Sequence, residues 1–318
     1  MKTNRTPGVS RRHFLMRAAM GMATTFFLQR RAFADGESPV TVIRNAAATA
    51  NITIQKLRGN VSVLQGSGGN IAVLTGRDGK VLVDAGITAS RPRITDALAE
   101  ISSDPVKALI NTHWHFDHTD GNEWVHSIGA EITAHEHTRK HLSETTRVDG
   151  WNFTFPPSPD GALPTKVFKK AQELQVNSTR LAMEYYGPSH TDSDISVYFA
   201  DADIFHVGDT WWNGHFPFID YNTGGSINGM IRAAEANVKR VTERTIVIPG
   251  HGPIGSQAGL IEFRDMLVTI RDKISALKKQ GNTIEEVLAA KPTSEYDAKW
   301  GGFVIDGKTF TSLIYAGL

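Results

Sequence analysis

Apolar residues occur in short runs through the first third of the chain, and glycine or proline residues separate most of these runs. Four of them, at 61–64, 71–74, 80–83 and 106–110, have the length and β-branched content of strands. Between the third and the fourth, residues 91–101 repeat apolar positions at helical spacing. The pattern predicts a sheet in which a helix connects two of the strands.

The second half of the chain repeats this alternation and then continues into a long helix. Residues 195–199 and 204–207 have the pattern of two strands joined by a hairpin. Residues 257–279 carry apolar side chains on one helical face, which predicts a helix packed on a core. Further strands are expected at 173–176, 180–185 and 245–248.

Three segments show neither the helical nor the strand spacing of apolar residues. Residues 35–50 are rich in alanine, threonine and asparagine, and we expect a flexible leader there. The glycine-rich segment 65–70 is expected to be a flexible hairpin tip, and its simplest interpretation is a turn. Residues 151–159 combine aromatic side chains with three prolines, which predicts an extended loop.

The densest chemical motif is His113-Trp114-His115-Phe116-Asp117-His118, which places four metal-ligating side chains within six residues. Neutral imidazole and carboxylate are ligands that Zn²⁺ and similar divalent cations prefer. The motif follows the strand at 106–110 and precedes a helix that begins near Glu123. The ligands are therefore expected on a strand-to-helix loop at the carboxyl edge of a sheet, where α/β proteins commonly place active sites.

More candidate ligands, each in a glycine- or proline-marked loop after a strand, are His190, Asp209 and His251. Over residues 52–255 these motifs together resemble the metallo-β-lactamase-fold hydrolases, with a seven-ligand site of the glyoxalase II and lactonase kind. Asp84 matches the family's upstream motif, in which the carboxylate supports the site. The resemblance implies an α/β fold, a four-layer αββα sandwich, with one domain over 51–318 that ends in C-terminal helices.

The resemblance also implies roles for the ligands. One metal would be bound by His113, His115 and His190, and a second by Asp117, His118 and His251, with Asp209 bridging the two. Two Zn²⁺ ions per chain are expected, with iron or manganese as alternatives. A hydroxide between the metals would attack a carbonyl carbon, and Asp117 would orient it and pass a proton to the leaving group. Esters, thioesters, lactones and lactams all suit this chemistry.

The sequence restricts the choice of substrate less than the choice of metal ligands. An aspartate ligand at 209 resembles the thioesterase and lactonase branches more than true β-lactamases, yet the basic residues that hold glutathione in the thioesterase branch are not evident. Aromatic residues instead suggest an apolar or ring-bearing small molecule. The candidate substrate-facing residues are Trp151, Phe153, Trp211, Trp212 and His215.

Several alternatives remain open. One is a β-lactamase acting on antibiotics, and another is a mononuclear iron sulfur dioxygenase that uses fewer of these ligands. A third is a non-catalytic metal-binding module, which a missing ligand would favour. His206, inside an apolar strand, is expected to be a core histidine, and no native metal role is expected for His126, His135, His137 or His141.

Residues 1–34 have the features of an export signal. Ser10-Arg11-Arg12-His13-Phe14-Leu15 resembles the twin-arginine motif, and a weakly apolar segment follows it. Ala32-Phe33-Ala34 fits a cleavage site, so Asp35 would be the mature N-terminus. The apolar segment is short and contains Arg17, which argues against a membrane span. We expect the twin-arginine export machinery as a partner and the periplasm as the location.

Removing that segment changes the charge of the protein. Residues 1–34 hold seven basic and no acidic residues, so the remaining chain holds 27 basic against 33 acidic residues, a net charge near −6. An acidic protein has no general attraction for phosphate backbones, so nucleic acid is not an expected partner. The chain has no cysteine, which excludes disulfides and thiolate ligands. The oligomeric state cannot be inferred from these features.

Overall fold

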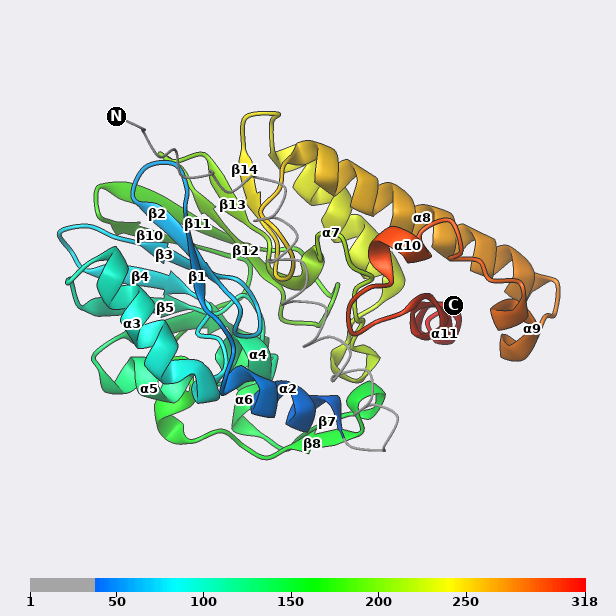
Figure 1. The fold of residues 1–318 in the computed structure, drawn as a ribbon, viewed down its shortest axis with the longest axis horizontal. Helices are drawn as coiled ribbons and strands as arrows, with labels where there is room; N and C mark the ends of the chain where they lie inside the picture. Colours follow the sequence, from blue (N-terminus) through cyan, green and yellow to red (C-terminus); the bar gives the residue numbers. More distant parts are fainter. Residues whose placement is uncertain (1–37) are drawn as a thin grey trace, which may run out of the picture.

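Two β-sheets lie face to face, and helices cover their outer faces (Figure 1). A computed structural model describes residues 38–318. The first sheet has seven strands in the order β1 (Thr53–Lys56), β2 (Val61–Gln65), β3 (Ile71–Leu74), β4 (Lys80–Val83), β5 (Val106–Ile110), β6 (Glu131–His135) and β9 (Lys166–Phe168). The second has five, in the order β10 (Ala171–Val176), β11 (Thr179–Tyr185), β12 (Ile195–Phe199), β13 (Ile204–His206) and β14 (Ile246–Ile248).

Side-chain alternation along the strands builds the layers. In β4, Val81 and Val83 join the core between the two sheets, while Leu82 points to the other face of its sheet. That outer face packs on α3 (Arg91–Ile101) and α5 (Asn122–Ser127). In the second sheet, Ile204 faces the inner core and Phe205 faces the helical side. The predicted four-layer αββα sandwich is therefore confirmed.

Helices from the second half of the chain cover the outer face of the five-stranded sheet. The main ones are α7 (Ile227–Arg240) and α8 (Gln257–Lys279), which pack on each other. The C-terminal segment continues through α9 (Ile284–Ala289), α10 (Asp297–Trp300) and α11 (Gly307–Ala316), and α11 returns to pack on α8 and α9 (Figure 1). Two further short α-helices within residues 38–318 are α4 (Phe116–Thr119) and α6 (Glu136–Ser143).

The flexible leader expected at 35–50 is wrong for most of that segment, whose first three residues lie outside the described range. Helix α2 (Pro39–Ala47) begins after Ser38, whose side chain accepts a hydrogen bond from the Val40 amide, and has proline in its first turn. Val40 and Ala47 are buried against the main helical core. Composition concealed this helix because the segment around it is rich in alanine, threonine and asparagine.

The extended loop expected at 151–159 is also partly wrong. Residues 153–155 form β8 (Phe153–Phe155), which pairs antiparallel with β7 (Thr146–Val148) in a separate small sheet. Asn152 turns the chain between them with a φ of 46°, a left-handed conformation that asparagine adopts at low cost. Strands of three residues are too short to show an alternating pattern.

No helix within residues 38–318 is both long and apolar enough to cross a membrane.

Candidate metal centre

The candidate ligands meet at one edge of the sandwich because the strands before them end there. His113 follows β5, Asp209 follows β13, and His251 follows β14. β13 and β14 are parallel, so their carboxyl ends lie side by side. His190 reaches the same edge from the loop after β11. The converging loops explain how residues separated by more than 130 positions, such as His113 and His251, form one cluster.

The first group of ligands is fully buried. The possible ligand atoms of His113, His115, His190 and Asp209 all lie within 4.8 Å of one another. His190 Nε2 is 2.9 Å from His115 Nδ1 and 3.3 Å from Asp209 Oδ2. His113 Nε2 lies 3.9 Å from the same carboxylate oxygen.

The second group adjoins the first through Asp209. Asp117, His118 and His251 form this group, in which His251 Nε2 is 3.2 Å from Asp117 Oδ2. Asp209 Oδ1 is 3.1 Å from His118 Nε2, and Asp209 Oδ2 is 3.3 Å from His251 Nε2. One carboxylate thus touches imidazoles of both groups, as the predicted bridging position requires.

Several atoms of the cluster are buried and make no hydrogen bond with any residue of the described chain. They are Nε2 of His113, His118 and His251 and Oδ1 of Asp209. An unpaired buried polar atom costs about 1–3 kcal/mol, so four in one cluster need an explanation. Metal coordination supplies one, because each of these atoms is a lone-pair donor directed into the same space. The donor set of five imidazoles and two carboxylates, with no thiolate, fits zinc or a similar divalent cation.

The charges in the cluster divide its histidines into two kinds. Burial and the neighbouring His118 lower the pKa of His113 well below its ordinary value, and burial lowers the pKa of His115 to about 4. Burial also acts to lower the pKa of His251, but Asp209 and Asp117 outweigh it and raise that pKa to about 9. Burial also acts to lower the pKa of His118, but the same carboxylates, with Asp84, outweigh it and raise that pKa well above its ordinary value. Without metal, the carboxylates therefore favour protons on the His118 and His251 side.

Acceptors outside the cluster fix the orientation of three ligand rings. His118 Nδ1 donates to Asp84 Oδ2 over 2.7 Å, and His190 Nδ1 donates to the Phe218 carbonyl over 2.8 Å. His115 Nε2 lies 3.1 Å from Asp220 Oδ2. Each bond leaves the opposite ring nitrogen facing the cluster, which is how outer partners orient metal-binding histidines.

Asp84 therefore occupies the supporting position expected from the sequence, whereas Asp220 was missed. It lies beyond the recognised motifs, in Phe218-Ile219-Asp220-Tyr221. A carboxylate in a run of apolar residues is a signal that it is buried with a partner. The sequence does not show that the partner is His115.

Glycines allow two loops to pack directly on the ligands. A Cβ at Gly69 would overlap the imidazole of His118, and one at Gly250 would overlap the carboxylate of Asp209. The segment 65–70 is therefore not the flexible tip expected, because Asn70 is buried and its side chain donates to the carbonyls of Pro249 and Gly252 over 2.9 and 3.0 Å. These two bonds fix the loop to the one that carries His251.

The aromatic candidates occupy different environments. The Trp151 ring lies 4.5 Å from the His115 ring, and the Trp212 ring lies 4.4 Å from that of His251. His215 stacks at 4.6 Å on Phe303, and burial together with His251 lowers the pKa of His215 to about 4.

The remaining two aromatic candidates do not border the ligands. Trp211 is wrong as a substrate-facing residue, because it is 0% exposed and packs beneath Gly255 and Gly259. Phe153 lies in the small hairpin, at 4.7 Å from Phe155, and has no ring contact with a ligand. The sequence showed that both were aromatic and near the motifs, but not which way they point.

The other histidines have structural partners. His206 Nε2 donates to the Asn70 carbonyl and its Nδ1 accepts from the Gly208 amide, as expected of a core histidine. His137 and His141 both contact Asp192, and His135 bonds to the Lys169 carbonyl. Within the described residues, none of the three joins a cluster able to hold a metal.

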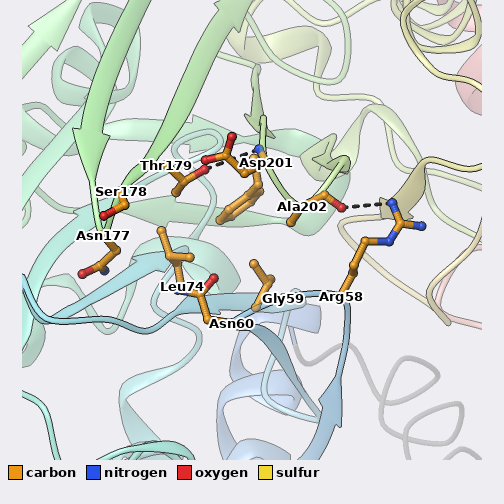
Figure 2. A pocket seen from close by; sticks show the side chains of 11 residues that line it. Arg58, Gly59, Asn60, Leu74, Asn177, Ser178, Thr179, Asp201 and Ala202 are labelled. Atoms are coloured by element: carbon orange, nitrogen blue, oxygen red, sulfur yellow. Dashed lines mark hydrogen bonds between the residues drawn. The ribbon is translucent and has the colours of Figure 1, made fainter.

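A cavity of about 220 Å³ lies at the opposite edge of the sandwich (Figure 2). Leu74, at the end of β3, and Ala202, just before β13, line it, so it borders the strand ends remote from Asp84 and Asp209. Arg58 at its rim donates to the carbonyls of Ala202 and Arg244. The cavity contains no histidine and is separate from the candidate metal centre.

Comparisons with known proteins agree with this geometry. Residues 64–251, which span every candidate ligand, match the model of the Metallo-beta-lactamase superfamily. A protein of Bacillus subtilis described as a probable metallo-hydrolase, YqgX, is 24% identical over 152 residues, which cover 46% of this chain and 68% of that protein.

Solved structures show the same fold at lower identity. The DIM-1 metallo-beta-lactamase superposes with a TM-score of 0.56 at 20% identity, covering 69% of this chain and 99% of its own. The sec-alkylsulfatase Pisa1 from Pseudomonas sp. superposes with a TM-score of 0.62 at 16% identity, covering 83% of this chain and 50% of its own. This chain is a member of the metallo-beta-lactamase superfamily and a metal-dependent hydrolase, with a cluster of histidines and aspartates able to bind metal.

Proposed function

We propose that this chain is an exported dinuclear zinc hydrolase that cleaves an ester, thioester, lactone or lactam. His113, His115 and His190 would hold one ion, and Asp117, His118 and His251 the other. The observation that carries the proposal is the position of Asp209, whose Oδ1 lies 3.1 Å from His118 Nε2 and whose Oδ2 lies 3.3 Å from both His190 Nε2 and His251 Nε2. A carboxylate placed between two ligand groups supports two ions in preference to one.

When bound, the two ions would supply an acidified water and a positive charge for the developing oxyanion. The side chain of Asp117 is 13% exposed, more than those of the other ligands it contacts. Burial acts to raise the pKa of Asp117, but His118 and His251 outweigh burial and lower it. An ionised carboxylate at this position is suited to accept a proton from the attacking water and deliver it to the leaving group.

A β-lactamase remains the runner-up, supported by the fold shared with DIM-1. Against it, Trp212 and Asn213 occupy the positions where β-lactamases of the common type often carry the lysine that anchors the substrate carboxylate. A mononuclear iron sulfur dioxygenase that used the first ligand group would leave Asp117, His118 and His251 without a role. A non-catalytic module is disfavoured because all seven ligand positions are filled.

The test is a substrate panel with the zinc-loaded protein. A lactone, a thioester, a cephalosporin and a secondary alkyl sulfate would be compared, the last because of the fold shared with Pisa1. We expect zinc-dependent hydrolysis of the lactone or thioester, and a loss of about 10²–10⁴-fold in kcat for Asp117→Asn if it retains its metals. Hydrolysis of the sulfate alone, or no turnover of any member, would reject the proposed reaction.

Export is the part of the proposal that rests on sequence alone, since residues 1–37 lie outside the described range. The motif around Arg11 and Arg12 supports twin-arginine transport, with cleavage after Ala34. N-terminal sequencing of the protein from the periplasmic fraction should begin at Asp35. A doubly substituted Arg11→Lys, Arg12→Lys precursor that still reached the periplasm would argue against this route.

A further inference from the structure

Aromatic rings border the candidate metal centre on two sides. On the first side the Trp151 ring lies 4.5 Å from His115 and stacks on Phe218 at 4.8 Å. On the second, the Phe303 ring lies 5.9 Å from His251 and stacks on His215 at 4.6 Å. The outer ring of each side, Trp151 or Phe303, is half-buried and keeps some exposed surface.

These two sides adjoin different ligand groups of the cluster. His115 contacts His190, His190 contacts Asp209, and Asp209 in turn contacts His251, through distances of 2.9, 3.3 and 3.3 Å. Trp151 adjoins the first histidine of this series and Phe303 adjoins the last. A molecule placed over the cluster would therefore have an aromatic ring beside each ligand group.

Phe303 comes from a part of the chain that the family motifs do not include. It lies between α10 and α11, beyond the superfamily match at 64–251. Its ring is also 5.8 Å from Trp212, a buried residue that contacts His251 directly. The C-terminal segment thereby contributes a side chain to the border of the metal centre.

Aromatic rings make this border largely apolar. Among residues 38–318, no lysine or arginine makes a cation–π contact with Trp151, Phe218 or Trp212. Three buried polar atoms of the rings in contact with Phe303 have no hydrogen-bond partner within residues 38–318: His215 Nδ1, Trp212 Nε1 and His251 Nε2. The faces of these rings match a planar apolar group.

We propose that Phe303 and Trp151 are specificity-determining residues, and that they hold a carbonyl substrate bearing an aromatic ring next to the bond that is cleaved. This inference rests on the proposed hydrolase function. For an aryl lactone, the water oxygen bonds to the carbonyl carbon, the bond between that carbon and the phenolic oxygen breaks, and the phenolic oxygen takes one proton of the water. The products are a phenol and a carboxylic acid, which releases the second proton to solvent and becomes a carboxylate.

Two neutral six-membered lactones test the proposal as a matched pair. Dihydrocoumarin carries the fused aromatic ring, and δ-valerolactone lacks it. Hydrolysis by the zinc-loaded protein would be followed at constant pH for the wild type, Phe303→Ala, Phe303→Leu and Val304→Ala. Stacking on Phe303 should stabilise the bound ring of dihydrocoumarin, so kcat/KM for this lactone should fall about tenfold in both Phe303 variants. The value of kcat/KM for δ-valerolactone, which has no aromatic ring, should fall less than about twofold. Val304→Ala, a change at the adjacent residue, should leave the ratio of the two unchanged.

A second measurement separates this inference from the proposed reaction. Chroman has the same ring system without the carbonyl, so its binding can be measured by titration calorimetry whether or not hydrolysis occurs. Binding that weakens about tenfold in Phe303→Ala supports the aromatic border even if neither lactone is hydrolysed, and then only the proposed reaction fails. Equal losses for both lactones, or chroman binding that is absent or insensitive to Phe303, would overturn the inference while leaving any measured hydrolysis intact.

Discussion

Asp84 and His118 are joined by a 2.7 Å hydrogen bond between Oδ2 of the carboxylate and Nδ1 of the imidazole. The same carboxylate accepts from the backbone amide and the hydroxyl of Thr112, at 2.8 and 2.7 Å. Asp84 has a φ of 67°, so its backbone adopts a left-handed conformation directly after β4. This arrangement links the end of one strand to the orientation of a candidate metal ligand.

Replacing this carboxylate should weaken metal binding without unfolding the protein. Asp84→Asn keeps the shape and tolerates the left-handed backbone, but it removes the charge that favours a donor at His118 Nδ1. We expect zinc affinity to fall about 10–100-fold, measured by competition with a chromogenic chelator. Asp203→Asn is the matched control, because Asp203 also has a positive φ, of 48°, and lies far from the cluster. Equal affinities for the two variants would show that Asp84 does not support the metal.

The metal-free protein should lose stability as pH rises from 6.5 to 9. His251 has a folded-state pKa raised from 6.5 to about 9 by Asp209 and Asp117, against the opposing effect of burial. The stability that protonated His251 contributes is fully present below its pKa in the unfolded state. This stability is lost as the pH rises through its pKa in the folded state. His118 acts in the same direction. His113 and His115, whose pKa values are lowered, act in the opposite direction only near the lower end of this window, where their unfolded forms still bind protons.

Thermal unfolding of chelator-treated protein across this range provides the check. The melting temperature should fall more steeply in wild type than in His251→Gln, which removes one of the titrating groups. Added zinc should stabilise the protein more at the upper end of the range, because metal and proton compete for the same nitrogen. A melting temperature that rises with pH in the metal-free protein would contradict the assigned charges.

Gly69→Ala should damage both stability and metal binding. The new methyl group would overlap the imidazole of His118, which is buried and held by Asp84, so one of the two loops must move. Overpacking of this kind costs about 1–3 kcal/mol. Gly161→Ala is a suitable control, because its Cβ would meet nothing closer than Glu123 Cγ at 3.6 Å. Chemical denaturation of both variants measures the difference, and a Gly69→Ala protein as stable as the control would show that the loop is not packed as described.

The helices and strands whose apolar residues recur at regular spacing were predictable from the sequence. Helices α3 and α8 have the same bounds as expected, and the hairpin of β12 and β13 was recognised from its alternation. Loops after these strands then had to converge, because parallel strands end at one edge. The seven candidate ligands were predicted from the resemblance of the motifs to the family, and their meeting in two adjoining groups agrees with that prediction.

What could not be predicted depends on contacts between distant segments. Helix α2 is stabilised by residues far along the chain, as when the hydroxyl of Ser38 donates to the Trp151 carbonyl over 2.8 Å. Asp220 and Phe303 belong to no motif, and only the fold brings them beside His115 and His251. Trp211 and Trp212 are adjacent in sequence, yet the backbone turns one into the core and the other towards the ligands.

The central claim is that one cluster holds two zinc ions, and metal analysis of the purified protein tests it most directly. The protein would be expressed with residues 1–34 present and purified without chelator, alongside His113→Ala and His251→Ala. We expect close to two zinc per chain in the wild type and about one in each variant, since each substitution removes a ligand of a different ion. About one iron and no zinc, or no bound metal in the folded wild type, would contradict the account.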